Sequence, residues 1–325
     1  MKKRWLAGAL TGAIALGGFS LLTPVQAEAE KKTDRSAPNL VLEATSPEPA
    51  FSLLDAGVEP RQPLRFVPQA NEMQTITITL QTNVAMAAGG QVLPSVDAPA
   101  STMTVESTIT QVDDNGDIHY QMYYTGIEVG ESPNAPPELR QVLEAQMQNL
   151  VGAGGTFVMD SRGHVKETNF SLSENADAMT QQLFQEVSQS VRQLSTPFPE
   201  EAVGLGARWQ IAQALEVNGM ELTQNAIYEL VSLQDNVATL NISLEQQAPS
   251  QEIEIPGLPD GATVTLNSLQ SQGEGQVTIQ LDRLMSESGT MSMQSDTDMK
   301  ISQAGMSEEM PMTSSTTIQM DWRSQ

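Results

Sequence analysis

The chain has 325 residues, a formal net charge of −24 and no cysteine. An acidic surface repels nucleic-acid phosphates and anionic lipid headgroups, so we expect neither nucleic-acid binding nor docking on an anionic membrane. The absence of cysteine excludes disulfides, thiol catalysis and Cys-ligated metal centres.

Residues 1–27 have the pattern of a secretory signal peptide. Lys2, Lys3 and Arg4 precede an uncharged apolar run, and the small residues PVQA follow it. Because the segment holds three of the 16 basic and none of the 40 acidic residues, cleavage leaves 13 basic against 40 acidic residues, a net charge of −27. No later segment approaches the roughly 20 apolar residues of a membrane span. We therefore predict a soluble exported protein, periplasmic or extracellular.

The composition after residue 27 suggests one tether and one domain. Residues 28–50 are polar, contain several prolines and have no periodicity, which predicts a disordered tether. We expect 51–325 to form a single β-rich domain. Near its start Arg61 and Arg65 stand out because arginine is scarce, and we expect them to act as a structural clamp that pairs with carboxylates.

Strand signals dominate from Thr75 onward, where Ile76, Ile78 and Leu80 alternate with threonines. Asn115-Gly116 between two β-rich runs predicts a hairpin with a type I′ turn, which needs positive φ at both central residues. Further turns are expected at 160–163, 218–219 and 234–236. The predicted strands cover 102–112, 118–129, 156–159, 164–170, 209–217, 221–233, 237–244, 263–269, 275–284, 289–302 and 311–322.

Two segments have helical periodicity instead. In 136–151, apolar residues follow i, i+3, i+4 spacing, with Pro136-Pro137 near the first turn and Gly152 as a stop. In 173–194, Met179, Leu183 and Val187 belong to a second apolar stripe. We therefore predict an α+β, mostly β fold: a curved antiparallel sheet or half-barrel of about eleven strands with two amphipathic helices packed on it.

Two motifs carry a resemblance. The segments LLDAGVEPRQPLR (53–65) and FPEEAVGLGARW (198–209) resemble recurring motifs of exported bacterial proteins of unknown function, over roughly residues 53–322. That family supplies no catalytic residues. At the level of fold alone, the strand and helix pattern is similar to the half-barrel of periplasmic lipoprotein carriers, which implies an apolar concavity that holds acyl chains.

Residues that could support catalysis are few. His119 and His164 are the only histidines, and no Gly-x-Ser-x-Gly elbow accompanies them. Asp113, Asn115 and Asp117 resemble the start of a calcium loop, but Ile118 and Tyr124 occupy the positions of its glycine and glutamate. Aromatic residues, which sugar-binding enzymes use as stacking surfaces, make up only 4% of the chain. We expect no enzyme activity, no metal and no cofactor.

Methionine is the most unusual residue choice, because eight of the 17 follow residue 284. By parity, one face of the last two strands should carry Met291, Met293, Met299, Ile301, Met312, Ile318, Met320 and Trp322. Three interpretations are open: flexible core filler, a pliant groove for an apolar ligand, and a thioether site for Cu(I), suggested by Met291-Ser-Met293 and Met310-Pro-Met312. Polar Ser314 and Thr316 on the same face count against a uniformly apolar lining.

These observations lead to a functional hypothesis with two alternatives. The hypothesis is a non-enzymatic binding module of the periplasm or cell envelope whose ligand is a lipid or acyl chain, lined by the eight residues above. The first alternative is a structural or assembly protein of the envelope that contacts another protein. The less favoured second alternative is a Met-rich Cu(I)-binding protein.

Overall fold

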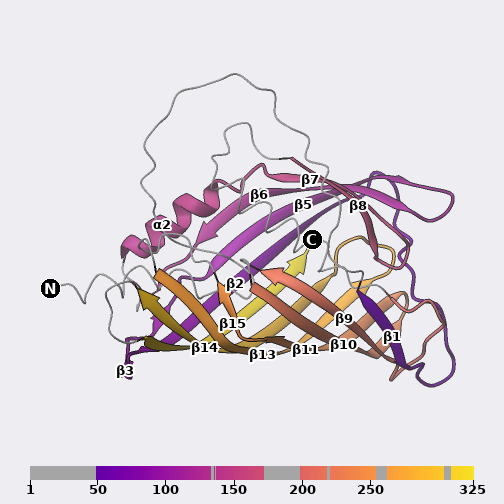
Figure 1. The fold of residues 1–325 in the computed structure, drawn as a ribbon. Helices are drawn as coiled ribbons and strands as arrows, with labels where there is room; N and C mark the ends of the chain where they lie inside the picture. The colour runs from indigo at the N-terminus through magenta and orange to yellow at the C-terminus, as the bar shows by residue number, and fades with distance from the viewer. Residues whose placement is uncertain are drawn as a thin grey trace.

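The computed structural model describes residues 49–132, 135, 137–171, 198–217, 220–253, 262–303 and 309–325. They form one large antiparallel sheet and a helix (Figure 1). The strands are β1 (Ala50–Asp55), β2 (Met73–Ala88), β3 (Gln91–Val92), β4 (Val96–Asp97), β5 (Ser101–Val112), β6 (Ile118–Val129), β7 (Gly154–Met159), β8 (Val165–Ser171), β9 (Arg208–Val217), β10 (Met220–Gln234), β11 (Val237–Ala248), β12 (Gln251–Ile253), β13 (Ala262–Gln280), β14 (Ser288–Gln303) and β15 (Met310–Ser324). The helix is α2 (Pro137–Gln148).

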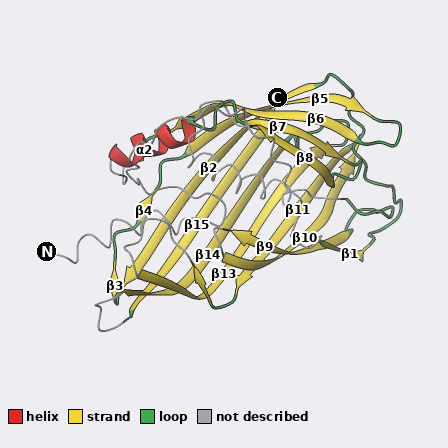
Figure 2. Ribbon diagram, turned by 45° about the horizontal axis from the view of Figure 1, so that its top comes forward, coloured by secondary structure: helices red, strands yellow, loops and turns green. Residues whose placement is uncertain are grey.

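The sheet is open and strongly curved. Its order is β1-β9-β10-β11-β13-β14-β15-β2-β5-β6-β7-β8, with β12 beside β13 and with β3 and β4 beside β2. In Figure 1 the part from β5 to β8 lies above the part from β9 to β13, and Figure 2 shows the same trough from another side. The strand β15 lies in the middle, between β14 and β2.

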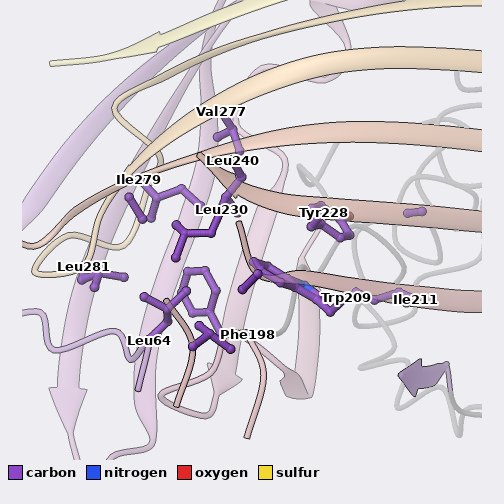
Figure 3. Packing of buried hydrophobic residues seen from close by; sticks show 14 residues of the cluster. Leu64, Phe198, Trp209, Ile211, Tyr228, Leu230, Leu240, Val277, Ile279 and Leu281 are labelled. Atoms are coloured by element: carbon purple, nitrogen blue, oxygen red, sulfur yellow. The ribbon is translucent and has the colours of Figure 1, made fainter. Parts of the chain in front are cut away.

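Side-chain alternation gives the sheet one buried face, here called the inner face. At one end of it a large cluster surrounds Trp209, which is fully buried and stacks on Tyr228 with ring centroids 5.8 Å apart. Leu64 and Phe198, from segments outside the strands, cover this end of the sheet (Figure 3). Burial of large aromatic and aliphatic side chains is the main favourable term in folding, so this cluster anchors the β9–β13 half.

The helix α2 covers another part of the inner face. Leu143, Met147 and Leu150 recur at helical spacing and pack in one cluster with Met103 of β5 and Ile127 of β6. This confirms the helix predicted over 136–151. The second predicted helix, 173–194, lies outside the described residues.

The mostly-β antiparallel fold is confirmed, and the structure corrects three details. The predicted strands 263–269 and 275–284 merge into one strand, β13, because β11 and β14 pair with it continuously through residues 270–274, and this strand ends at Gln280 rather than at residue 284. Four short strands, β1, β3, β4 and β12, were not predicted, and they bring the sheet to fifteen strands rather than about eleven.

The third correction concerns a turn. The hairpin between β5 and β6 forms as predicted, but only Gly116 has positive φ (85°), and its N–H donates to the Asp113 carbonyl. The turn is therefore not type I′, which also needs positive φ at Asn115. Asp235 and Asn236, between β10 and β11, do both have positive φ, at 48° and 65°.

Candidate functional site

The predicted methionine face exists, and the strand register defines it. Across β14 and β15, Met299 lies opposite Met312, Met293 opposite Ile318, and Met291 opposite Met320. Residues directly opposite on one face have Cβ atoms about 4.5–5.5 Å apart, so these pairs are in contact range. Ile301 follows Met299 on the same face, opposite Met310, and Trp322 lies opposite Gly289.

These eight residues do not form one continuous apolar wall. Met299, Ile301 and Met312 are at most 2% exposed and belong to a cluster with Val84 and Met86 of β2. Trp322, at the far end, packs against the Trp209 cluster instead, and its indole Nε1 donates to Ser286 Oγ at 2.7 Å.

A band of buried hydroxyls separates the two ends. It consists of Ser271, Ser295, Ser314 and Thr316, each 3–6% exposed. Ser271 Oγ donates to Ser295 Oγ at 2.8 Å, and among the described residues Ser314 Oγ has no hydrogen-bond partner. A buried polar group without a partner costs free energy, so this band is a poor lining for a purely apolar ligand.

Among the surface hollows of the described residues, two lie beside the sheet, and none of the eight predicted residues lines either of these two. The larger, about 520 Å³, crosses β13, β14, β15 and β2; its lining includes Ala85, Ala87, Ser315 and the carboxylates of Asp296 and Asp298. The smaller, about 260 Å³, lies beside Asn83, Asp97 and Glu131. Most lining residues of both hollows are small, polar or acidic.

Arg61 and Arg65 lie where the two sequence motifs meet. Arg65 donates to the carbonyls of Leu64, Pro199 and Glu200 at 2.7–2.8 Å, rather than to the carboxylate that we expected. Arg61 donates to the Gly57 carbonyl and lies 3.6 Å from Glu59 Oε1 at an exposed position. Both arginines thus hold backbone carbonyls, and Arg65 joins residues more than 130 positions apart.

The backbones of the two motifs also bond directly. The Val58 N–H donates to the Leu205 carbonyl at 2.9 Å, and the Gly204 N–H donates to the Ala56 carbonyl at 2.9 Å. Gln62 and Val203 form an isolated β-bridge. The resemblance motifs at 53–65 and 198–209 therefore form one corner of the molecule, beside β1 and β9.

This corner exposes apolar side chains that sequence reasoning missed. Nine large hydrophobic side chains of the described residues are exposed, and four of them are here: Leu54, Val58, Leu205 and Val231, at 39–64% exposure. We call these four residues the corner patch. No local pattern in the sequence indicates it, because it depends on the long-range pairing of 56–58 with 203–206 and on the Gly206 N–H bond to the Leu230 carbonyl.

Both histidines lie near turns, and their partners include the carboxylates of those turns. His119 Nε2 lies 2.8 Å from Asp113 Oδ2, and the hydrogen bonds from His119 and Gln111 lower the pKa of the Asp113 carboxyl. Lys166 donates to Asp117 Oδ1 at 2.6 Å and lowers the pKa of that carboxyl. The His164 N–H donates to Asp160 Oδ1 within the β7–β8 turn.

The described residues contain no group of three or more His, Asp or Glu placed to hold a metal ion. The carboxylates of the calcium-like loop are engaged with His119 and Lys166 instead. Burial raises the pKa of the Tyr120 phenol, which keeps it neutral. Within the same residues, no helix has both the length and the hydrophobicity required to cross a membrane.

Fold and site together define a mostly-β protein built on one open, curved antiparallel sheet. Residues 115–286, about half of the chain, match a family of unknown function (DUF6263), and the chain belongs to this family. This confirms the resemblance to proteins of unknown function. No curated protein matches the sequence.

Among solved structures, the chain is similar to outer membrane proteins at very low TM-scores. A loop-deletion mutant of OmpT, an outer membrane protein of Vibrio cholerae, has 5% identity and a TM-score of 0.18; the match covers 76% of this chain and 99% of that one. A triple mutant of Rhodopseudomonas blastica porin has 10% identity and a TM-score of 0.19, covering 77% and 100%.

Proposed function

We propose that this protein is an exported, non-enzymatic binding module of the cell envelope that acts by contacting another protein at the corner patch. The observation that carries the proposal is the position of the patch beside β1, which pairs only with β9 at one end of the described sheet. Exposed aliphatic side chains next to an open strand edge favour association with another polypeptide.

The chemistry of the corner suggests what kind of partner fits. The edge of β1 that has no partner strand among the described residues offers backbone N–H and C=O groups that an extended segment can pair with by strand addition. Around the patch, Asp55, Glu59, Glu200 and Glu201 are exposed carboxylates. The partner is therefore an extended peptide segment with apolar side chains for the patch and basic side chains for the rim.

Site-specific photo-crosslinking in the native cell envelope tests the proposal. A photoreactive residue in place of Val58 or Leu205 is expected to cross-link to a defined protein, and a second change, Leu54→Asp, is expected to abolish that product. The matched control is Val92, which is 86% exposed but lies at β3, away from the corner. The same cross-links from Val92, or none from the corner, contradict the proposal.

A lipid or acyl-chain ligand is the second candidate, favoured by the six methionines that β14 and β15 place on one face. Against it stand the hydroxyl band and the tight burial of Met299 and Met312. Native mass spectrometry of protein purified from its own compartment separates the candidates. A constant small-molecule adduct supports the carrier, whereas a consistently bare mass together with protein complexes supports the contact module.

A further inference from the structure

Four methionines from three neighbouring strands meet at one end of the inner face. Met86 of β2, Met299 of β14 and Met312 of β15 are 2–6% exposed and share one cluster, against which the partly buried Met310 packs. We call these four residues the thioether cluster. The residues that pack around the thioether cluster, among them Val84, Val264 and Ile301, are aliphatic.

The register explains why the sulfur atoms can converge. Met312 lies directly opposite Met299 on β14 and opposite Ala88 on β2, so Met86 is its diagonal neighbour. Met310, opposite Ile301, is the diagonal neighbour of Met299. Diagonal neighbours in an antiparallel sheet are about 7–8 Å apart, within reach of long side chains. The three rotatable bonds of methionine let the four thioethers turn toward one point.

From this placement we propose that the thioether cluster binds one Cu(I) ion. Neutral, soft thioether donors select Cu(I), whereas Zn²⁺, Ca²⁺ and Mg²⁺ require imidazole, thiolate or oxygen ligands, none of which this cluster contains. The surrounding aliphatic side chains would keep water from the bound ion. The partly buried Met310 would let the ion enter from the surface. The net charge of −24 favours the approach of a cation.

The structure selects a different set of ligands from the sequence pattern. Met-x-Met spacing singled out Met291 and Met293 together with Met310 and Met312. The hydroxyl band separates these two pairs, and β14 and β2 supply Met299 and Met86 as the neighbours of Met312 instead. The site therefore depends on long-range strand pairing and not on adjacent methionines.

If these methionines only fill the core, replacing them with leucine should change little, whereas a Cu(I) site should lose its affinity for the ion. Methionine and leucine have similar volumes, so Met→Leu changes in a core largely preserve packing. Leucine has no sulfur donor. The triple variant M86L/M299L/M312L therefore separates a metal site from ordinary packing, and M103L/M147L in the α2 cluster is the matched control because it also removes buried thioethers.

The test is an anaerobic competition for Cu(I) against bicinchoninate, using the full chain. The wild-type protein and M103L/M147L are expected to bind one equivalent, and the triple variant is expected to lose at least about tenfold in affinity. Equal affinities of wild type and triple variant, or no competition by the wild type, overturn the proposal.

If the triple variant fails to fold, the wild-type protein still decides the question. Its methionine methyl groups, labelled with ¹³C and assigned by single Met→Leu changes, are followed by NMR during Cu(I) addition. Stoichiometric shifts at Met86, Met299 and Met312 support the site. Shifts confined to Met291, Met293 and Met320, or no shifts at all, overturn it.

Discussion

Single glycines allow the two motif segments to approach each other at the corner. Gly57 has φ of +74°, and a Cβ added there would overlap the carbonyl oxygen of Gly204. Gly206 has nearly the same φ, +78°, but open space around its Cα. An added Cβ would therefore cause backbone strain at both glycines, but steric overlap only at Gly57.

Gly57→Ala is expected to destabilise the protein more than Gly206→Ala. Both changes incur the left-handed penalty of about 1–2 kcal/mol, and Gly57→Ala adds about 1–3 kcal/mol for overlap. The free energy of unfolding in urea measures the difference. Equal losses of unfolding free energy for the two variants would show that the backbone near Gly57 relaxes and removes the overlap with Gly204.

The pair of Asp113 and His119 predicts a dependence of stability on pH. Because the pKa of Asp113 is lower in the folded protein than its ordinary value of 3.8, its stabilisation is present above that value and is lost as the pH falls through the folded pKa. Asp113→Asn removes this contribution. Urea unfolding measured from about pH 6 to pH 2 should therefore show a shallower acid loss for the variant than for the wild type. Parallel curves would contradict the assignment.

At the scale of elements, α2 provides the clearest test of packing. Leu143 is buried against β5 and β6, whereas its neighbour Val142 is 38% exposed. Leu143→Ala is expected to cost about 2–5 kcal/mol because it leaves a cavity. Val142→Ala should change stability by no more than about 0.5 kcal/mol. Thermal or urea unfolding of both variants checks this, and similar losses would mean that α2 does not depend on its apolar face.

Local patterns predicted the elements that depend on near neighbours. The stripe of Leu143 and Met147 and the hairpin at Asn115-Gly116 are both set by residues a few positions apart, and both elements form. The continuity of β13 was missed because the polar segment 270–274, which contains Gly273, has low strand propensity, and only the flanking strands β11 and β14 override it.

The candidate sites could likewise be predicted only where they depend on residues close together in the sequence. Parity correctly placed Met299 and Met312 on one face, because alternation within a strand is local. It could not show that Met86 of β2 lies beside them, nor that Val58 and Leu205 meet at a corner. Both facts arise from pairing between distant segments, which one sequence does not reveal.

At the scale of the whole molecule, the excess of carboxylates should oppose folding. With a net charge of −24, repulsion among exposed groups is screened by salt. Raising NaCl from about 10 to about 300 mM should increase Tm by roughly 2–4 °C if screening contributes about 1 kcal/mol. The effect should vanish near the sequence pI of 4.2. An unchanged Tm at neutral pH would show that the charges lie too far apart to interact.

The position of β15 constrains how the molecule is assembled during synthesis. Residues 310–324 fill the place between β14 and β2, so β2 must wait for a partner that is translated roughly 220 residues later. Until then the newly made chain consists of two unjoined half-sheets, each with a bare edge. The sheet is therefore completed only when residues 310–324 have been made, and until then the two unpaired edges can pair with other chains.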